Sequence, residues 1–539
     1  MTIVDPSASH EDGWPIGLQR EVKVFRFAGA IAMLLASAAP ASGETLVDAI
    51  AEAYRHNPAL QAQRAELREL DESVVQAGAP YRMSADATAT IGYNDRLQRS
   101  AFDAGFARFE QRSMGASLSV SQLLSSGGRT AAQISAAEAD VLVGRERLRE
   151  AENRTIYQVV DAYISVRRDT ELAAIQARAA ASYERQVSQA RAREGEGDLT
   201  RIDIAQAEAQ LMIIRAALLQ TQASLEQSRS RFAAVVGRNP GDLEPPPPLP
   251  GLPRSVDVGY LIAGQESPSL WQAILGEKAS RHRIAAERAE RHPVISAQGS
   301  FGYVNPLGYQ VRDLGRTVSG GITVTVPILT QGVVGSRVRA AIAAQQSAEF
   351  LVEDARRSVD AAVLNAWNQS VTARRQIESG EAAVIAARTA LDGVKLGFAE
   401  GFRSNFELID SEQRLLNAQV IVANARYGLY AGQATMLALL GRLQLAALVP
   451  STQLYDPTRE LRRNRARQIG PFEPLVHLID RAQVPSDRSR PSPVVTINND
   501  PEFAPAGSAG IDGPLARELP FPVVGSVPGP ITPKIKQGR

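Results

Sequence analysis

The chain carries the same helix–turn–helix pattern twice, at the spacing of 204 residues that separates Gly197 from Gly401. Residues of like type coincide along both copies. The aligned pairs are Asp203 with Glu407, Glu208 with Glu412, Ala162-Tyr163 with Ala366-Trp367, and Val236-Gly237-Arg238 with Leu440-Gly441-Arg442. Because each copy must form the same supersecondary unit, a duplication of this length constrains the architecture more than any single residue does.

Composition argues against several classes of function. The chain has 539 residues, of which 44% are hydrophobic, and a formal net charge of +1. This size allows a large core, and the near-zero charge does not indicate a nucleic-acid partner. The lack of cysteine argues against disulfides, thiolate metal sites, cysteine nucleophiles and a lipid-anchored N-terminal cysteine. The five histidines are scattered, so we expect neither a histidine metal site nor a cofactor.

Residues 22–43 have the pattern of a secretory signal peptide. Two basic residues precede an apolar run that is too short to span a bilayer as a mature helix. Small residues from Ala39 to Gly43 offer cleavage sites. A short N-terminal membrane anchor is the alternative interpretation. Because residues 1–21 would stand ahead of this signal, we expect the natural start to be Val22, read from a non-AUG codon.

Each half of the chain, residues 44–244 and 258–450, has the order helix, strand, strand, helix. A proline-rich linker, residues 245–257, joins the halves. A helix over Arg129–Glu194 would be about 100 Å long, and the apolar spacing of the following helix suits coiled-coil packing. Residues 451–539 are rich in Pro, Arg and Ser without sustained periodicity, so we expect a largely disordered tail.

Four segments alternate strictly between apolar residues and small polar ones. They are Ala85–Tyr93, Ser113–Ser121, Ile295–Tyr303 and Thr317–Val326, and a polar loop is expected at Asn94–Arg112. The segments have the length of a tilted transmembrane β-strand, and their two faces fit lipid outside and water inside. A soluble sheet with one buried face is the alternative. The secretory signal and the lack of a globular domain to cover the sheet favour the membrane.

Four strands cannot close a barrel, and an open edge in lipid leaves backbone groups unpaired at a cost of several kcal/mol each. We therefore expect the chain to pool strands with copies of itself. Eight-stranded barrels are filled by side chains, whereas twelve strands from three chains would leave an open lumen. The expected fold is an α+β membrane protein. In it, a trimeric 12-stranded outer-membrane β-barrel continues into a long coiled-coil α-helical barrel in the periplasm.

Several spaced motifs lie within the duplication, over about residues 44–450. They are Asn57-Pro58, Gly127-Gly-Arg-Thr130, Ala162-Tyr163, Gly195-Glu-Gly-Asp198 and Leu415-Leu-Asn-Ala-Gln419. Together they resemble the TolC family of outer-membrane efflux and secretion channels. The resemblance implies a homotrimer in the outer membrane of a Gram-negative bacterium, in contact with lipid. It also implies a periplasmic adaptor protein and an inner-membrane ABC or RND transporter at the periplasmic tip. Without a lipid-attachment cysteine, the chain looks like the secretion-type branch.

The resemblance assigns roles to residues near the second helical turn. Glu407 and Asp410 match the family's two acidic positions at the periplasmic aperture, and Arg403 matches its gate arginine. Asp203 matches the acid that helps to hold the gate shut. Phe398 stands where the family's best-known member has a tyrosine. Because phenylalanine cannot donate a hydrogen bond, we expect one gate link to be absent.

Helix capping offers a simpler explanation for two of these acids. Ser404-x-x-Glu407 is a capping box, and Thr200-x-x-Asp203 is nearly one. Capping does not account for Asp410, which lies one turn beyond Glu407 on the same helix face. On a threefold axis, three copies of both second-repeat acids would gather six carboxylates, and full ionisation would then require cations nearby.

The predicted function is that of a passive conduit, the outer-membrane exit duct of a tripartite export system, and not of an enzyme. The sequence has neither a Gly-x-x-x-x-Gly-Lys-Ser/Thr loop nor a His-Glu-x-x-His helix, so the energy must come from a partner. A secreted periplasmic coiled-coil scaffold without channel activity is the alternative. Within the channel hypothesis, type I protein secretion and drug or metal efflux both remain open.

Overall fold

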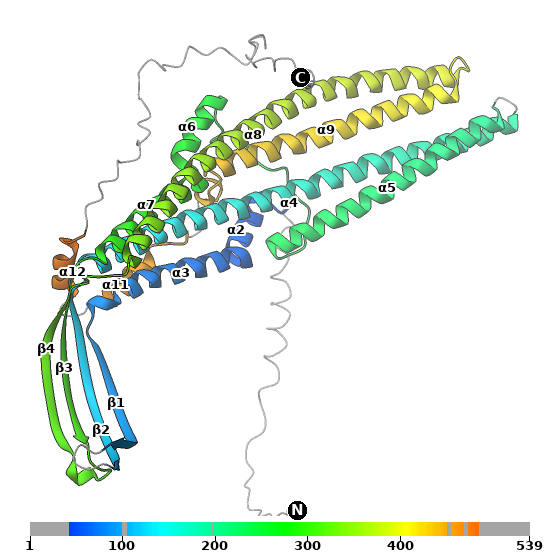
Figure 1. The fold of residues 1–539 in the computed structure, drawn as a ribbon. Coiled ribbons are helices and arrows are strands. Elements are labelled where there is room, and N and C mark those ends of the chain that lie inside the picture. The colour runs from blue at the N-terminus through cyan, green and yellow to red at the C-terminus, as the bar shows by residue number, and fades with distance from the viewer. Residues whose placement is uncertain (1–42, 100–104, 197–198, 450–453, 468–472, 485–539) are drawn as a thin grey trace, which may run out of the picture. The chain divides into compact units, whose positions relative to one another are not determined.

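The computed structural model describes residues 43–99, 105–196, 199–449, 454–467 and 473–484 (Figure 1). The predicted signal peptide and the possible start at Val22 lie outside the described residues. None of the described helices is both long and apolar enough to cross a membrane.

The described helices follow the duplicated plan that the sequence predicts. In the first half they are α2 (Leu46–His56), α3 (Pro58–Gly78), α4 (Arg129–Glu196) and α5 (Arg201–Val236). In the second half they are α6 (Val256–Glu266), α7 (Pro268–Ala289), α8 (Val333–Ala399) and α9 (Asn405–Leu439). Helix α4 has 68 residues and α8 has 67, so each is about 100 Å long. Short helical segments occur at η1 (Ala79–Tyr81), η2 (Val311–Asp313) and α10 (Leu445–Leu448).

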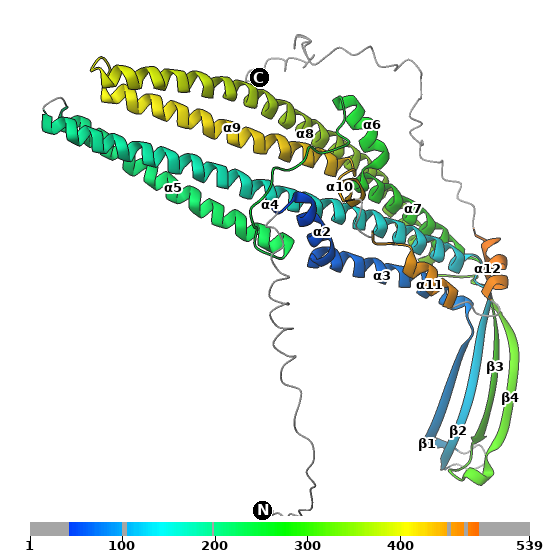
Figure 2. The ribbon, with the colours of Figure 1, turned by 180° about the vertical axis from the view of Figure 1, so that it is seen from behind.

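The long helices form two antiparallel hairpins, α4 with α5 and α8 with α9, whose turns lie at the same end (Figures 1 and 2). Helix α4 also packs along α9, which joins the hairpins side by side. The largest cluster of buried residues includes the fully buried ring of Tyr163. Its hydroxyl lies 2.8 Å from the carbonyl oxygen of Glu44 and 2.6 Å from that of Glu244, and burial raises its pKa to about 12. Tyr163 therefore ties the start and the end of the first half to α4.

The strands form one antiparallel sheet at the end of the helices away from the two turns (Figure 1). They are β1 (Ser84–Arg99), β2 (Phe106–Ser125), β3 (Val294–Asn305) and β4 (Gly315–Thr325), paired in that order. The register aligns apolar residues with apolar ones, and small polar residues with small polar ones, across the four predicted strands. One row across the sheet is Ala87, Leu118, Phe301 and Val318, and the next is Thr88, Ser117, Gly302 and Thr317. One face is therefore apolar and the other consists of small polar residues, while β1 and β4 have no described neighbour on their outer edges.

The prediction of a polar loop at Asn94–Arg112 is wrong for most of these residues, because β1 continues to Arg99 and β2 begins at Phe106. Ladder pairing continues through this stretch, and Arg108 bonds both carboxylate oxygens of Asp95 across the two strands. The alternation that marked the strands in the sequence ends where charged residues occupy both faces. The backbone ladder does not need that alternation, since a two-stranded ribbon can extend into water.

The expectation of a disordered tail is wrong for residues 454–467 and 473–484. Two nine-residue helices, α11 (Arg459–Arg467) and α12 (Glu473–Arg481), lie there. Helix α11 packs on α3, and α12 packs on α4 and β2. Helices this short show no sustained periodicity in a sequence, and tertiary contacts stabilise them. Residues 485–539 lie outside the described part of the chain.

Candidate functional site

The turn between α8 and α9 is held by backbone hydrogen bonds at its base. Gly401 has a φ of 78°, in the left-handed region that favours glycine. The carbonyl oxygen of Gly397 accepts hydrogen bonds from the backbone N–H groups of Phe402, at 2.7 Å, and Arg403, at 3.1 Å. These bonds end α8 and reverse the chain, which places the predicted gate residues around a fixed bend.

Both turns close with a capping box, so the capping explanation for two of the acids is confirmed. The Ser404 hydroxyl accepts a hydrogen bond from the backbone N–H of Glu407 at 3.2 Å, and the Glu407 carboxylate accepts one from the Ser404 N–H at 3.0 Å. Thr200 and Asp203 make the same exchange in the first repeat, at 3.3 and 3.0 Å. Each acid satisfies backbone donors that the first turn of its helix would otherwise leave free.

Arg403, the gate arginine suggested by the resemblance, pairs with an acid of its own turn. Its Nη1 donates to the Glu407 carboxylate at 3.0 Å. The Ser404 backbone N–H and then this guanidinium lower the pKa of Glu407 below its usual value. Glu407 is therefore ionised at neutral pH and serves both as a helix cap and as the partner of Arg403.

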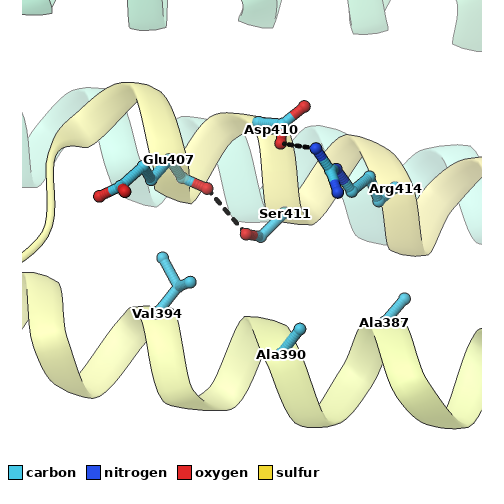
Figure 3. Close-up of a pocket in the computed structure, with 7 residues that line it drawn as sticks. All are labelled: Ala387, Ala390, Val394, Glu407, Asp410, Ser411 and Arg414. Carbon is cyan, nitrogen blue, oxygen red and sulfur yellow. Dashed lines mark hydrogen bonds and ion pairs between the residues drawn. The ribbon is translucent and has the colours of Figure 1, made fainter.

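Asp410 has an ion-pair partner that the sequence analysis missed. The carboxylate lies 2.8 Å from Nη2 of Arg414, one turn further along α9 (Figure 3). The two residues, with Glu407 and Ser411, line one side of a groove of about 210 Å³ between α8 and α9. The other side consists of small apolar residues of α8, namely Ala387, Ala390 and Val394. The Arg414 side chain is largely exposed and that of Asp410 is 43% exposed, so the pair leaves Asp410 accessible to solutes.

The two hairpins are joined at their tips by two residues that the sequence analysis did not single out. Arg193, in the last turn of α4, donates from Nη1 to the carbonyl oxygen of Phe398 at 3.0 Å. Its guanidinium also lies 4.6 Å from the centre of the Phe398 ring, in a cation–π contact. On the other side, Nδ2 of the buried Asn405 donates to the carbonyl oxygen of Asp203 at 3.1 Å. We call these two contacts the tip links.

The tip links alter the roles that the resemblance gives to Phe398 and Asp203. The Phe398 side chain has no hydrogen-bond donor, but its ring stacks with the Arg193 guanidinium and its carbonyl oxygen accepts a hydrogen bond from it. Asp203 contributes its backbone carbonyl group, because its carboxylate is occupied by the capping box. The structure thus brings both residues to the contact between the hairpins, whereas the Arg403 guanidinium bonds within its own turn.

A second layer of polar contacts lies further from the tip and is itself duplicated. Glu412 is 7% exposed, accepts a hydrogen bond from the Ser182 hydroxyl at 2.7 Å, and lies 3.5 Å from Nζ of Lys395. Its counterpart Glu208 pairs with Arg191, which aligns with Lys395 at the 204-residue spacing. The helix-to-helix ion pair is therefore common to both hairpins. The second-repeat copy also bonds the neighbouring hairpin, because Ser182 lies on α4 and Glu412 on α9.

The family model for outer membrane efflux proteins matches the chain twice, over residues 49–238 and 261–442. The chain belongs to the outer membrane efflux protein family. The split match coincides with the two halves and confirms the internal duplication. Family membership also confirms the predicted TolC-like fold and identifies the chain as a non-enzymatic outer-membrane channel of Gram-negative efflux and secretion systems.

Two relatives and one solved structure illustrate the range of this efflux protein family. The chain is 28% identical over 431 residues to the outer membrane efflux protein BepC of Brucella suis, covering 80% of this chain and 92% of BepC. It is 25% identical over 366 residues to the alkaline protease secretion protein AprF of Pseudomonas aeruginosa, covering 65% of this chain and 74% of AprF. The Campylobacter jejuni CmeC outer membrane channel superposes with a TM-score of 0.68 at 14% identity, covering 79% of this chain and 90% of CmeC.

In this efflux-family channel, loss of the capping box at the second turn is expected to destabilise only the first turn of α9. Replacing Ser404 with alanine removes the acceptor for the Glu407 N–H and is expected to destabilise the start of α9 by about 1 kcal/mol. Amide exchange of residues 404–408 should accelerate by roughly fivefold, with the rest of α9 unchanged. Ser404→Thr retains the hydroxyl and serves as the control. Unaltered exchange in Ser404→Ala would show that the box does not hold this helix end.

Proposed function

We propose that the chain assembles as a homotrimer and acts as the exit duct of a tripartite export system. The sheet is the observation on which this proposal rests. The register of its four strands places their apolar residues on one face, and its two outer strands lack a described neighbour. Three copies joined edge to edge would make a closed barrel of twelve strands and satisfy the edge backbone groups within the membrane. Membership in the outer membrane efflux protein family supports this assembly, because the resemblance to TolC channels implies a homotrimer.

The proposed partners at the tip are a periplasmic adaptor protein and an inner-membrane ABC or RND transporter. In support, large apolar side chains at both turns are exposed to solvent in the single chain. Phe402 is 83% exposed, Phe406 is 65% exposed, and Ile202 on the neighbouring hairpin is 69% exposed. Exposed aromatic residues beside charged ones are typical of protein contact sites.

The proposed mechanism is opening of the helical tip by partner-driven separation of the two hairpins in each protomer. The tip links through Arg193 and Asn405 hold the hairpins together in this structure. The partner would supply the energy to break them, since the chain has no nucleotide-binding loop. Glu407 and Asp410 would then face the aperture as rings of carboxylates, with Arg403 and Arg414 as the neighbouring cations.

Three measurements separate this proposal from a secreted coiled-coil scaffold. The channel should fractionate with outer membranes, be extracted by detergent as a trimer, and conduct ions in planar bilayers. A soluble protein without conductance would support the scaffold. The cargo class is decided separately, by deleting the gene and assaying both secreted proteins and drug sensitivity, because relatives named for efflux and for protease secretion both match.

A further inference from the structure

The corner where β2 turns into α4 forms a cluster of hydrogen-bond donors. Gly127 and Gly128 have φ values of 67° and 90°, so the backbone turns sharply and directs N–H groups to one side. The N–H groups of Ser126 and Gly128, the Ser126 hydroxyl and the hydroxyl of Tyr81 from η1 all converge on one point. Convergent neutral donors of this kind are suited to bind a carboxylate.

The carboxylate of Asp480, on α12, occupies this cluster and is fully buried. Its Oδ1 accepts from the backbone N–H of Ser126 at 2.6 Å and of Gly128 at 3.0 Å. Its Oδ2 accepts from the hydroxyls of Ser126 at 2.6 Å and Tyr81 at 2.8 Å. Burial acts to raise the pKa of Asp480, but the hydrogen bonds outweigh burial and the pKa is lowered. The bound group is therefore an ionised carboxylate.

The surface of α12 fits closely around this central contact. Glu473 lies 3.3 Å from Nε of Arg82, and the His477 ring meets the edge of the Tyr81 ring at 5.7 Å between centroids. A Cβ atom on Gly128 would come within 2.7 Å of the Val484 backbone. Only glycine therefore allows the chain after α12 to pass this corner.

A second anchor lies at the other end of the segment. The Tyr455 ring lies 5.1 Å from the guanidinium of Arg64, a buried residue of α3 that also stacks on the Tyr54 ring at 4.5 Å. The backbone N–H of Tyr455 donates to the Tyr54 hydroxyl at 3.3 Å. Between the two anchors, α11 packs along α3, and Leu461 contacts the main buried cluster.

We propose that residues 454–467 and 473–484 form a strap, two short helical segments of the chain itself, which packs on α3 and binds the β2–α4 corner through Asp480. The strap contacts β2 where it meets α4, and it also packs on α3 and α4. These contacts lie at the opposite end of α4 from the tip links. Its role is to fix the strands to the helices, so that movement at the tip is not transmitted to the sheet. The corner is then a peptide-binding site whose ligand class is a helix bearing one buried carboxylate.

The test compares full-length variants purified as the wild-type assembly, followed by hydrogen exchange and limited proteolysis. In Asp480→Asn, which cannot supply an ionised carboxylate, the amides of residues 126–130 should exchange at least about tenfold faster. Residues 473–484 should also become sensitive to protease. The matched control is Asp456→Asn, an exposed acid of the same strap, which should behave like wild type. Exchange of residues 400–410 should be unchanged in both variants.

Two results would overturn the strap. One is unaltered exchange at residues 126–130 in Asp480→Asn, and the other is equal acceleration in Asp456→Asn. If Asp480→Asn fails to assemble while Asp456→Asn assembles normally, the corner contact is required for folding and the strap is supported. Tyr81→Phe removes one hydroxyl donor and keeps both the ring and the carboxylate, so it should give an intermediate acceleration of the same amides. No acceleration in this variant would count against carboxylate binding at the corner.

Discussion

Replacing Arg193 with alanine is expected to open the closed channel in the absence of any partner. The variant loses a charged hydrogen bond to the Phe398 carbonyl group and the cation–π contact with its ring. Such contacts contribute about 1.5–3 and 0.5–2 kcal/mol, so the closed state should lose roughly 2–5 kcal/mol per protomer. A loss of 2 kcal/mol already shifts the balance between closed and open states by about 30-fold.

The measurement is the open probability of single channels in planar bilayers, together with the entry of large antibiotics into cells. Arg193→Lys keeps the charge but not the planar stacking group, so it should open the channel less than alanine does. Arg201 is the matched control, because it lies at the same tip with a side chain that is 95% exposed. If Arg193→Ala and Arg201→Ala open the channel equally, the link does not hold the gate.

The parts of the fold that could be predicted are those with a repeating signal in the chain. The 204-residue spacing located both hairpins, and the alternation of small polar and apolar residues located four strands whose register then proved to be in phase. Periodicity of this kind reports which face of an element is buried. It carries no information on short elements held by a few specific side-chain contacts. For that reason α12, which binds through Asp480, was missed.

The tip links were missed for a related reason. Spacing within one helix identifies neighbours at three or four residues, whereas Arg193 and Phe398 meet only because α4 packs on α9 in one particular register. The pair of Asp410 and Arg414 could have been found, since the two residues are four apart on a helix. Capping does not account for Asp410, but this pair gives it a structural role, although an ion pair of this kind stabilises a helix by only about 0.5 kcal/mol.

Removing one or the other member of the Asp410–Arg414 pair is expected to change cation block of the channel in opposite directions. If Asp410 lies at the aperture, Asp410→Ala should lower cation selectivity and weaken block by divalent or hexammine-type cations. Arg414→Gln should strengthen block, because it leaves the carboxylate without its compensating cation. By Coulomb's law in water, a divalent cation about 7 Å from a carboxylate gains roughly 1.2 kcal/mol. Three carboxylates would give about 3.6 kcal/mol without salt, and screening over about 7 Å at physiological ionic strength roughly halves this energy, so we expect a change of roughly 10- to 100-fold in the blocking concentration.

Reversal potentials in a salt gradient and titration of the blocking cation measure both effects on the same channels. Glu353 and Arg357 are the matched control, since they form an exposed ion pair with the same four-residue spacing on α8, outside the tip turns. Their neutral variants should leave block unchanged. Arg403→Gln should also strengthen block, but less, because Glu407 is still held by the backbone N–H of Ser404. Block that is equal in Asp410→Ala and wild type would remove Asp410 from the aperture and leave its pairing with Arg414 as its whole role.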